Sequence, residues 1–174
     1  MYDMNECVER VLFSADTIQD IVSRLGRQIS EDYKGKKLLL VSVLKGSVVF
    51  MADLMRSITI PCEIDFMVVS SYGAGTRSSG NVKIVKDLSI DVKDYDLLLV
   101  EDILDSGVTL STLKKMREGR CPASIKICTF LINPNAERLI SRLIIPARQF
   151  PTSLLSATDW IMMKNSAICL MSAC

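Results

Sequence analysis

An α/β fold with a mostly parallel sheet flanked by helices is predicted by three features of this 174-residue sequence. Continuous apolar runs, such as KLLLVSVL at 37–44, are typical of strands buried on both faces. Segments with helical spacing of apolar residues alternate with these runs, as in successive βαβ units. The length suits one domain with a sizeable core.

The expected elements follow one another closely along the chain. An amphipathic helix is expected over 15–31, where large apolar residues recur at helical spacing, with Ser14 or Asp16 near its cap. After it we expect a strand at 37–44, a helix at 48–58, strands at 63–72, 82–88 and 94–101, a helix at 109–118 and a strand at 123–131. The strand at 123–131 closes the series, and GAGTRSSGN at 73–81 is expected to be a flexible loop.

Composition argues against several classes of protein. With 49% hydrophobic and 24% charged residues, the chain is expected to be soluble and globular. Its net charge of +1 gives no general attraction to nucleic acid or membrane, and no apolar run approaches the ~20 residues of a membrane span. The acidic start, MYDMNECVER, differs from a signal peptide. Six cysteines without a C-x-x-C pair fit reduced thiols in a cytoplasm rather than a zinc site.

Histidine is absent from the whole sequence. This excludes Ser-His and Cys-His nucleophile pairs and histidine-ligated metals. Any proton transfer must therefore use Asp, Glu, Lys, Tyr or Cys.

The segment LLLVEDILDSGVTL at 97–110 carries the strongest functional signal. Ligands of parallel α/β sheets bind at the carboxyl ends of strands, and here a buried strand ends in Glu101 and Asp102, followed by Asp105. Such carboxylates accept hydrogen bonds from sugar hydroxyls and can hold Mg²⁺. The turn at 106–109 precedes a predicted helix, whose free N–H groups and dipole favour a phosphate. Together these features predict a sugar-phosphate site, in which Asp105 removes a proton or stabilises positive charge on a sugar carbon.

Each part of this segment also has a plainer interpretation. Asp105 alone is more often a helix cap, and an SGVT turn is common in loops. The spacing differs from that of an NTPase P-loop. It is the ordered combination after an apolar strand that favours the sugar-phosphate site.

VEDILDSGVT at 100–109 closely resembles the phosphoribosyl pyrophosphate signature of the type I phosphoribosyltransferases and fills every position of it. Three more segments, at 38–58, 63–73 and 122–129, are similar to bacterial hypoxanthine (guanine) phosphoribosyltransferases. The resemblance covers about residues 11–130. It implies the Rossmann-like type I phosphoribosyltransferase fold. It also implies a reaction that joins purine N9 to ribose C1 and releases pyrophosphate, with Mg²⁺ as cofactor.

The resemblance implies a role for individual residues. Glu101 and Asp102 would hold the ribose hydroxyls and contribute to the Mg²⁺ site, and Asp105 would be the general base at N7 of the purine. Ser71 and Tyr72 would begin a mobile loop that closes over the reacting centre. The pyrophosphate loop, with a non-proline cis peptide between its first two residues, would consist of Leu44, Lys45 and Gly46. The 5′-phosphate would be held by Asp105, Ser106, Gly107, Val108 and Thr109.

Residues 131–174 depart from the family. The last glycine is Gly119, whereas α/β domains normally place glycine at turns and helix ends. The family has here a Leu-Asp-Lys-Pro turn and a strand ending in Gly-Leu-Asp-Tyr. These segments supply the lysine that reads the purine O6, an aromatic residue that stacks on the base and an Asp for Mg²⁺. We therefore expect a phosphoribosyltransferase core at 1–130 and an aberrant tail at 131–174 in place of the C-terminal hood segment.

A one-base shift of the reading frame accounts for this tail. With permitted codons, shifted residues 131–137 encode Asp-Lys-Pro-Glu-Arg-Arg, and shifted residues 152–164 encode Glu-Phe-Val-Val-Gly-Tyr-Gly-Leu-Asp-Tyr-Asp-Glu. The following residues encode Lys-Phe-Arg-Asn-Leu-Pro-Tyr in the same frame. We hypothesise the loss of one base near Phe130–Leu131, with a divergent tail or a fusion remnant as alternatives. For the chain as written we expect poor solubility and little catalysis.

The sequence thus predicts a cytoplasmic purine-salvage enzyme, a hypoxanthine phosphoribosyltransferase. It would bind phosphoribosyl pyrophosphate and a purine base, give IMP or GMP, and form a homodimer or homotetramer. Two alternatives are a catalytically impaired chain and a non-catalytic regulator that senses phosphoribosyl pyrophosphate. Regulators of that kind carry a DNA-binding helix domain or a basic face, which a net charge of +1 does not favour. The choice among hypoxanthine, guanine and xanthine lies in the missing segment and stays open.

Overall fold

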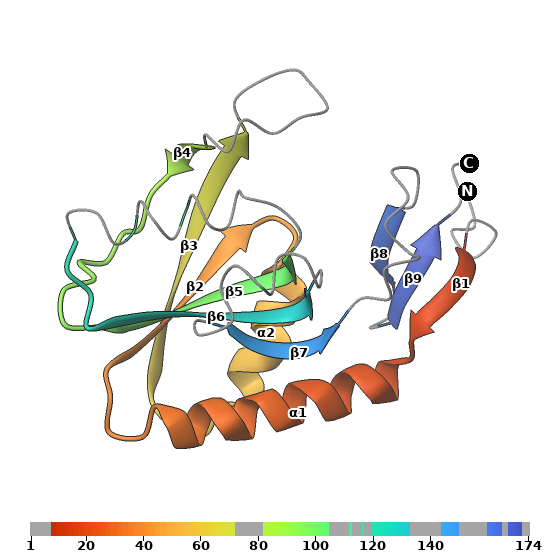
Figure 1. Ribbon diagram of the computed structural model, residues 1–174, viewed down its shortest axis with the longest axis horizontal. Coiled ribbons are helices and arrows are strands. Elements are labelled where there is room, and N and C mark those ends of the chain that lie inside the picture. The colour runs from red at the N-terminus through yellow and green to blue at the C-terminus, as the bar shows by residue number, and fades with distance from the viewer. Residues whose placement is uncertain are drawn as a thin grey trace.

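Parallel strands build the larger of two sheets in the computed structural model (Figure 1). The structure describes residues 8–71, 82–104, 112, 116, 120–132, 144–149, 160–164 and 167–171. The larger sheet has the order β4-β3-β2-β5-β6-β7, with β4 antiparallel to β3 and the other neighbouring pairs parallel. Its strands are β2 (Leu38–Leu44), β3 (Cys62–Ser71), β4 (Val82–Lys86), β5 (Asp96–Leu104), β6 (Ser124–Ile132) and β7 (Ile144–Gln149).

Two described helices cover one face of this sheet. They are α1 (Ala15–Asp32) and α2 (Val48–Ser57). The Oγ of Ser14 accepts the N–H of Thr17 at 3.3 Å, which confirms the predicted cap of α1. Buried side chains of both helices pack on alternate residues of the central strands, because every second strand residue faces the same side. These strand residues are Leu38, Leu40, Leu98, Val100, Cys128 and Phe130.

The opposite face of the sheet has its own buried cluster, which includes Leu39, Val41, Val43, Leu97 and Leu99. Thr112 and Met116 are the described residues of the predicted helix at 109–118, and both are helical and buried. Met116 packs in this second cluster. The predicted mostly parallel sheet with cover on both faces is therefore confirmed.

A smaller antiparallel sheet, ordered β1-β9-β8, pairs the start of the described chain with its tail. Its strands are β1 (Val8–Phe13), β8 (Trp160–Lys164) and β9 (Ala167–Met171). In Figure 1 it lies beside the N-terminal end of α1, apart from the larger sheet. Sequence analysis predicted none of these strands.

One added strand and one later strand end are the largest departures from expectation in this sheet. The expected series ended with the strand at 123–131, but β7 adds a further parallel strand beside β6. β5 was expected to end at Glu101, but its pairing with β6 continues to Leu104. The pairing partner, which the sequence pattern does not reveal, extends the sheet in both cases. The acids at 101 and 102 therefore lie within the end of the strand.

Candidate active site

The predicted pyrophosphate loop and the predicted ribose-binding acids lie at the same edge of the larger sheet. β2 and β5 are parallel neighbours in register, with Ser42 opposite Val100. Leu44 ends β2, and Lys45 and Gly46 follow it as exposed turn residues. Because the carboxyl ends of parallel strands meet at one edge, this loop comes close to Asp102 on β5. The structure thus brings together two segments that are far apart in the sequence.

Gly46 and Asp102 lie close together across these two segments. A Cβ atom placed on Gly46 would lie 2.7 Å from Oδ2 and 3.1 Å from Oδ1 of Asp102. Contacts below 3.0 Å are essentially never seen for real Cβ atoms. The absence of a side chain at Gly46 therefore allows the carboxylate to lie against the loop backbone.

The Asp102 carboxylate is partly buried but accepts few hydrogen bonds. Burial raises its pKa above the usual range, and the N–H groups of Ile103 and of Asp102 itself only partly oppose this shift. The Ile103 N–H donates to Oδ1 at 2.9 Å. A carboxylate that has lost water without gaining equivalent donors is stabilised by an added hydroxyl donor or cation. This is the electrostatic property expected of a ligand-binding acid.

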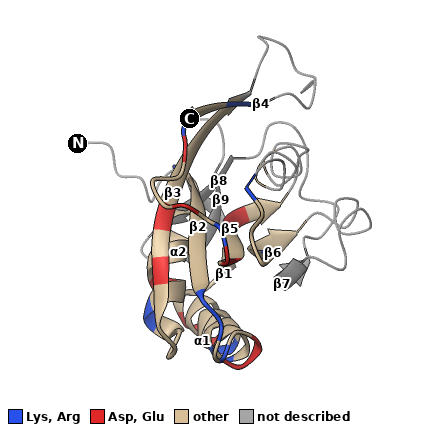
Figure 2. Ribbon diagram, turned by 90° about the vertical axis from the view of Figure 1, so that its left-hand side faces the viewer, with Lys and Arg blue, Asp and Glu red and all other residues tan. Residues whose placement is uncertain are grey.

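Glu101 occupies a different position from its neighbour. Its side chain is 8% exposed, and it pairs in register with Thr129 of β6. Glu101 lies two residues after Leu99, so strand alternation directs it to the sheet face opposite α2, whereas Asp102 is directed toward the α2 side. The two acids can therefore reach one ligand only at the edge of the sheet. In the view of Figure 2, acidic residues mark both β3 and β5, and Lys and Arg are scattered.

The loop after β2 has the backbone that the resemblance implies. The peptide between Leu44 and Lys45 is cis, which confirms the expected non-proline cis bond. Ser47 follows at the N-cap of α2 and is fully buried. Its Oγ lies 2.8 Å from the Oγ of Ser42 and donates to the carbonyl of Val43 at 2.8 Å. Sequence analysis did not single out these serines, although a serine within the apolar run of β2 was a signal.

Several predicted site residues lie outside the described part of the chain. These are Tyr72, Asp105, Ser106, Gly107, Val108 and Thr109. Ser71 is the last residue of β3, where it pairs with Val82 of β4. The roles expected for these residues stay predictions.

Glu101 and Asp102 fit the Mg²⁺ that the resemblance implies. Among the described residues, no three Cys, Asp or Glu side chains gather as a complete metal site. Hard carboxylate oxygens are nevertheless suitable ligands, and Mg²⁺ commonly uses one or two of them together with water and substrate phosphates. The desolvated Asp102 carboxylate would gain most from a nearby cation.

Asp65 on β3 is a second buried acid that sequence analysis missed. It accepts the N–H groups of Phe66 at 2.7 Å, Ser89 at 2.6 Å and Ile90 at 3.3 Å. Lys86 of β4 lies 3.4 Å from it and also donates to the Phe66 carbonyl at 2.6 Å. Because its acceptor sites are occupied by these groups, Asp65 joins β3, β4 and the following turn rather than binding a ligand.

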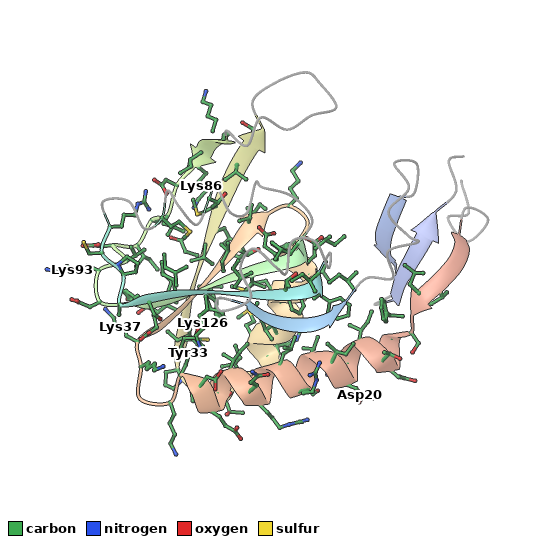
Figure 3. All side chains as sticks on the ribbon, viewed as in Figure 1. Asp20, Tyr33, Lys37, Lys86, Lys93 and Lys126 are labelled. Atoms are coloured by element: carbon green, nitrogen blue, oxygen red, sulfur yellow. The ribbon has the colours of Figure 1, made fainter. Side chains whose placement is uncertain are left out.

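Polar groups also gather at the opposite, amino end of the sheet. Figure 3 shows Tyr33, Lys37 and Lys126 together near the end of α1. The Nζ of Lys126 lies 5.8 Å from the Tyr33 ring centroid, and that of Lys37 lies 3.8 Å from the centroid of Tyr95. These contacts are cation–π interactions at the far end of the strands from Asp102. They stabilise this edge and take no part in the candidate site.

The chain is similar to known proteins of one family. The phosphoribosyl transferase domain matches residues 14–145, which is more than half of the chain. The hypoxanthine-guanine phosphoribosyltransferase of Mycobacterium tuberculosis is 47% identical over 135 residues, covering 74% of this chain and 67% of that protein.

Solved structures extend the likeness to the fold. The hypoxanthine-guanine phosphoribosyltransferase of Bacillus anthracis has a TM-score of 0.82 and 32% identity, over 94% of this chain and 99% of that chain. A Trypanosoma cruzi hypoxanthine phosphoribosyl transferase, studied for the role of its C-terminal region in oligomeric state and activity, has a TM-score of 0.81. It is 30% identical over 95% of this chain and 92% of that chain. The chain belongs to the phosphoribosyl transferase family, among the bacterial hypoxanthine-guanine phosphoribosyltransferases.

Proposed function

We propose that the protein transfers the 5-phosphoribosyl group from phosphoribosyl pyrophosphate to hypoxanthine, and to guanine, in purine salvage. The observation that carries this proposal is the contact between Gly46 and Asp102. It sets a loop suited to pyrophosphate beside a carboxylate suited to ribose hydroxyls, so that one substrate carrying both groups could reach both. The names of the relatives favour this enzyme over a non-catalytic regulator.

In the proposed reaction, the purine N9 bonds to ribose C1 as the bond from C1 to pyrophosphate breaks. Asp102 and Glu101 orient the ribose through its hydroxyls, and the loop at 44–46 holds the pyrophosphate. Asp105 accepts the proton from N7, and residues 105–109 hold the 5′-phosphate. Glu101 and Asp102 would hold Mg²⁺ in part, and the bound ion would supply positive charge near the departing pyrophosphate. Ser71 and Tyr72 begin the loop that excludes water from the reacting centre.

A paired assay tests this proposal. Turnover of hypoxanthine with Mg²⁺ and phosphoribosyl pyrophosphate is measured beside a calorimetric titration with phosphoribosyl pyrophosphate alone. Turnover that is lost in Asp105→Asn supports the enzyme. Binding without turnover supports the regulator, and neither binding nor turnover indicates an impaired chain.

We also propose that residues 1–130 are the native core and that residues 131–174 result from the loss of one base near Phe130–Leu131. The match to the phosphoribosyl transferase domain ends at residue 145, within the tail. Sequencing the coding DNA across Cys128 to Leu131 tests this directly. A restored base should give a chain that turns over hypoxanthine at least tenfold faster than the chain as written. An unchanged DNA sequence, or equal rates, would remove the frameshift hypothesis.

We infer that the protein forms a homo-oligomer through the outer face of α2. Val48, Val49 and Met55 of this helix are 42%, 44% and 38% exposed, whereas Phe50, Met51 and Leu54 are buried. Asp53 and Arg56 form an ion pair beside them, so two copies related by a twofold axis would present both charges to each other. Met55→Glu should shift the mass measured by light scattering to that of a monomer. Val85→Glu, at an exposed position of β4, is the matched control and should leave the mass unchanged.

The proposed location is the cytoplasm. Cys62, Cys121 and Cys128 are free thiols. No described helix is long and apolar enough to cross a membrane. Cell fractionation with an antibody to the chain tests this location.

A further inference from the structure

Two buried serine hydroxyls join the two ends of the loop at 44–46. Ser42 lies on β2 before the loop and Ser47 lies after it, and both side chains are fully buried. Their Oγ atoms are 2.8 Å apart, and the Oγ of Ser47 is also 2.8 Å from the Val43 carbonyl oxygen. The loop is thus closed at its base by two linked hydrogen bonds, one between residues five positions apart and one between residues four positions apart.

The direction of these hydrogen bonds follows from counting protons. A serine hydroxyl has one proton to donate, and Ser47 donates its proton to the Val43 carbonyl. Ser42 must therefore donate to Ser47. Ser47 takes part in both bonds, whereas Ser42 takes part in one. Removing Ser47 would leave the buried Ser42 hydroxyl without this acceptor, and removing Ser42 leaves the second bond intact.

Ser47 does not serve as an ordinary helix cap. A serine at the N-cap usually accepts an N–H from the first turn, but Ser47 makes no side-chain cap bond to α2. Its hydroxyl is directed back to Val43 on β2 instead. The first turn of the helix keeps one bond to the loop, from the Val48 N–H to the Lys45 carbonyl at 3.3 Å. The serine therefore stabilises the loop rather than the helix end.

The loop that this pair closes is also the one in contact with Asp102. Gly46 is the residue before Ser47, and its backbone approaches the carboxylate too closely to admit a Cβ. A shift of a few tenths of an ångström at Ser47 would therefore change the contact between the loop and the acid. Buried side chains with satisfied hydrogen bonds are suited to fixing such a position.

We propose that the Ser42–Ser47 pair is a positioning element, which closes the loop at 44–46 and holds it against Asp102 before any ligand binds. This inference rests on the proposed function of the loop as the pyrophosphate site. Neither serine touches substrate in the proposal. They act through the backbone of Lys45 and Gly46.

The test compares Ser47→Ala, Ser42→Ala and the double variant with Ser30→Ala. Ser30 is the matched control because its buried Oγ also donates to a carbonyl four residues earlier, that of Gly26 at 2.6 Å, and accepts the Thr59 N–H at 3.0 Å. It lies on α1, away from the loop. Two readouts are needed: hydrogen exchange of the Lys45 and Gly46 amides without ligand, and calorimetric titration with phosphoribosyl pyrophosphate and Mg²⁺.

Ser47→Ala should speed exchange at Lys45 and Gly46 by about tenfold and weaken phosphoribosyl pyrophosphate binding by about tenfold, the effect of one typical hydrogen bond. Ser42→Ala should speed loop exchange and weaken binding by about threefold each. The double variant should match Ser47→Ala in both measurements. Ser30→Ala should lower thermal stability without changing loop exchange or binding. Loop exchange that is unchanged in both single serine variants, or equal in Ser30→Ala, would overturn the proposal. If the wild-type chain fails to bind the ligand, the proposed function fails, and exchange still decides the role of the pair.

Discussion

Asp65 and Asp102 are two aspartates in the same sheet whose surroundings shift their pKa values in opposite directions. Burial alone would raise the pKa of both carboxyls. At Asp65 the N–H groups of Phe66, Ser89 and Ile90, together with the charge of Lys86, outweigh burial, and the pKa falls below the usual range. At Asp102 the N–H groups of Ile103 and Asp102 do not outweigh burial, and the pKa rises.

The difference separates a structural acid from a ligand-binding acid. A buried carboxylate surrounded by donors lowers the energy of the folded chain alone, whereas one short of donors lowers it only when a ligand supplies them. Asp65 lies within β3, and Asp102 lies at the carboxyl edge beside the loop at 44–46. The comparison predicts that one acid determines stability and the other determines binding.

The largest effect is expected for Asp65→Ala. It removes the acceptor of three backbone N–H groups and leaves the Lys86 ammonium, 3.4 Å away, without its carboxylate. Each buried N–H group left without its acceptor costs about 1–3 kcal/mol, so a total loss of about 3 kcal/mol or more is expected. Urea unfolding measures the loss. Ligand binding by the folded fraction should change less than twofold, and a larger change would contradict the division of roles.

Asp102→Asn should have the converse effect. It removes the negative charge that the proposed ribose hydroxyls and cation require, at about 1.5–3 kcal/mol, or roughly 10- to 150-fold in affinity. Calorimetric titration with phosphoribosyl pyrophosphate measures the loss. The free energy of unfolding should be equal or higher, because a desolvated charge is removed. A clear loss of stability would show that Asp102 is a second structural acid.

Sequence analysis predicted the region around Asp102 better than the region around Asp65. The apolar runs predicted β2 and β5, and the alternation of strands with helices predicted a mostly parallel sheet with its carboxyl ends at one edge. The structure then showed that β2 and β5 are neighbours. The family signature then identified the acids. The cis bond at Leu44–Lys45 was predicted in the same way.

The donors around Asp65 could not be predicted from the sequence. The acid occupies an ordinary alternating position in EIDF, and its partners are backbone N–H groups of residues 24 and 25 positions later. Backbone groups have no sequence signature. The same reason applies to β1 and β7–β9, because strand pairing depends on a partner that local periodicity does not identify.

Two glycines, one beside the candidate site and one in the core, separate binding from stability in the same way. A Cβ at Gly46 would meet the Asp102 carboxylate, and a Cβ at Gly26 would lie 2.4 Å from the carbonyl oxygen of Ser57, where α1 packs on α2. Gly46→Ala should therefore weaken phosphoribosyl pyrophosphate binding by about tenfold with little change in stability. Gly26→Ala should lower the free energy of unfolding by about 1–3 kcal/mol without changing affinity. Unfolding curves and titrations of both variants check the pair, and the same outcome for both would contradict it.

The smallest expected effect is a pair of opposite pH dependences. Asp65 has a lowered pKa in the folded chain, so its contribution to stability is present above the ordinary value of 3.8 and is lost as pH falls through the lowered pKa. Asp102 has a raised pKa, so its contribution is present below 3.8 and is lost as pH rises through the raised pKa. Unfolding free energies of the wild type, Asp65→Asn and Asp102→Asn between about pH 3 and pH 7 separate the two. The stability deficit of Asp65→Asn relative to the wild type should shrink as pH falls. The stability of Asp102→Asn relative to the wild type should increase as pH rises. If both differences changed in the same direction, the two carboxyls would share one environment, and the assignment of Asp102 as the ligand-binding acid would lose its electrostatic basis.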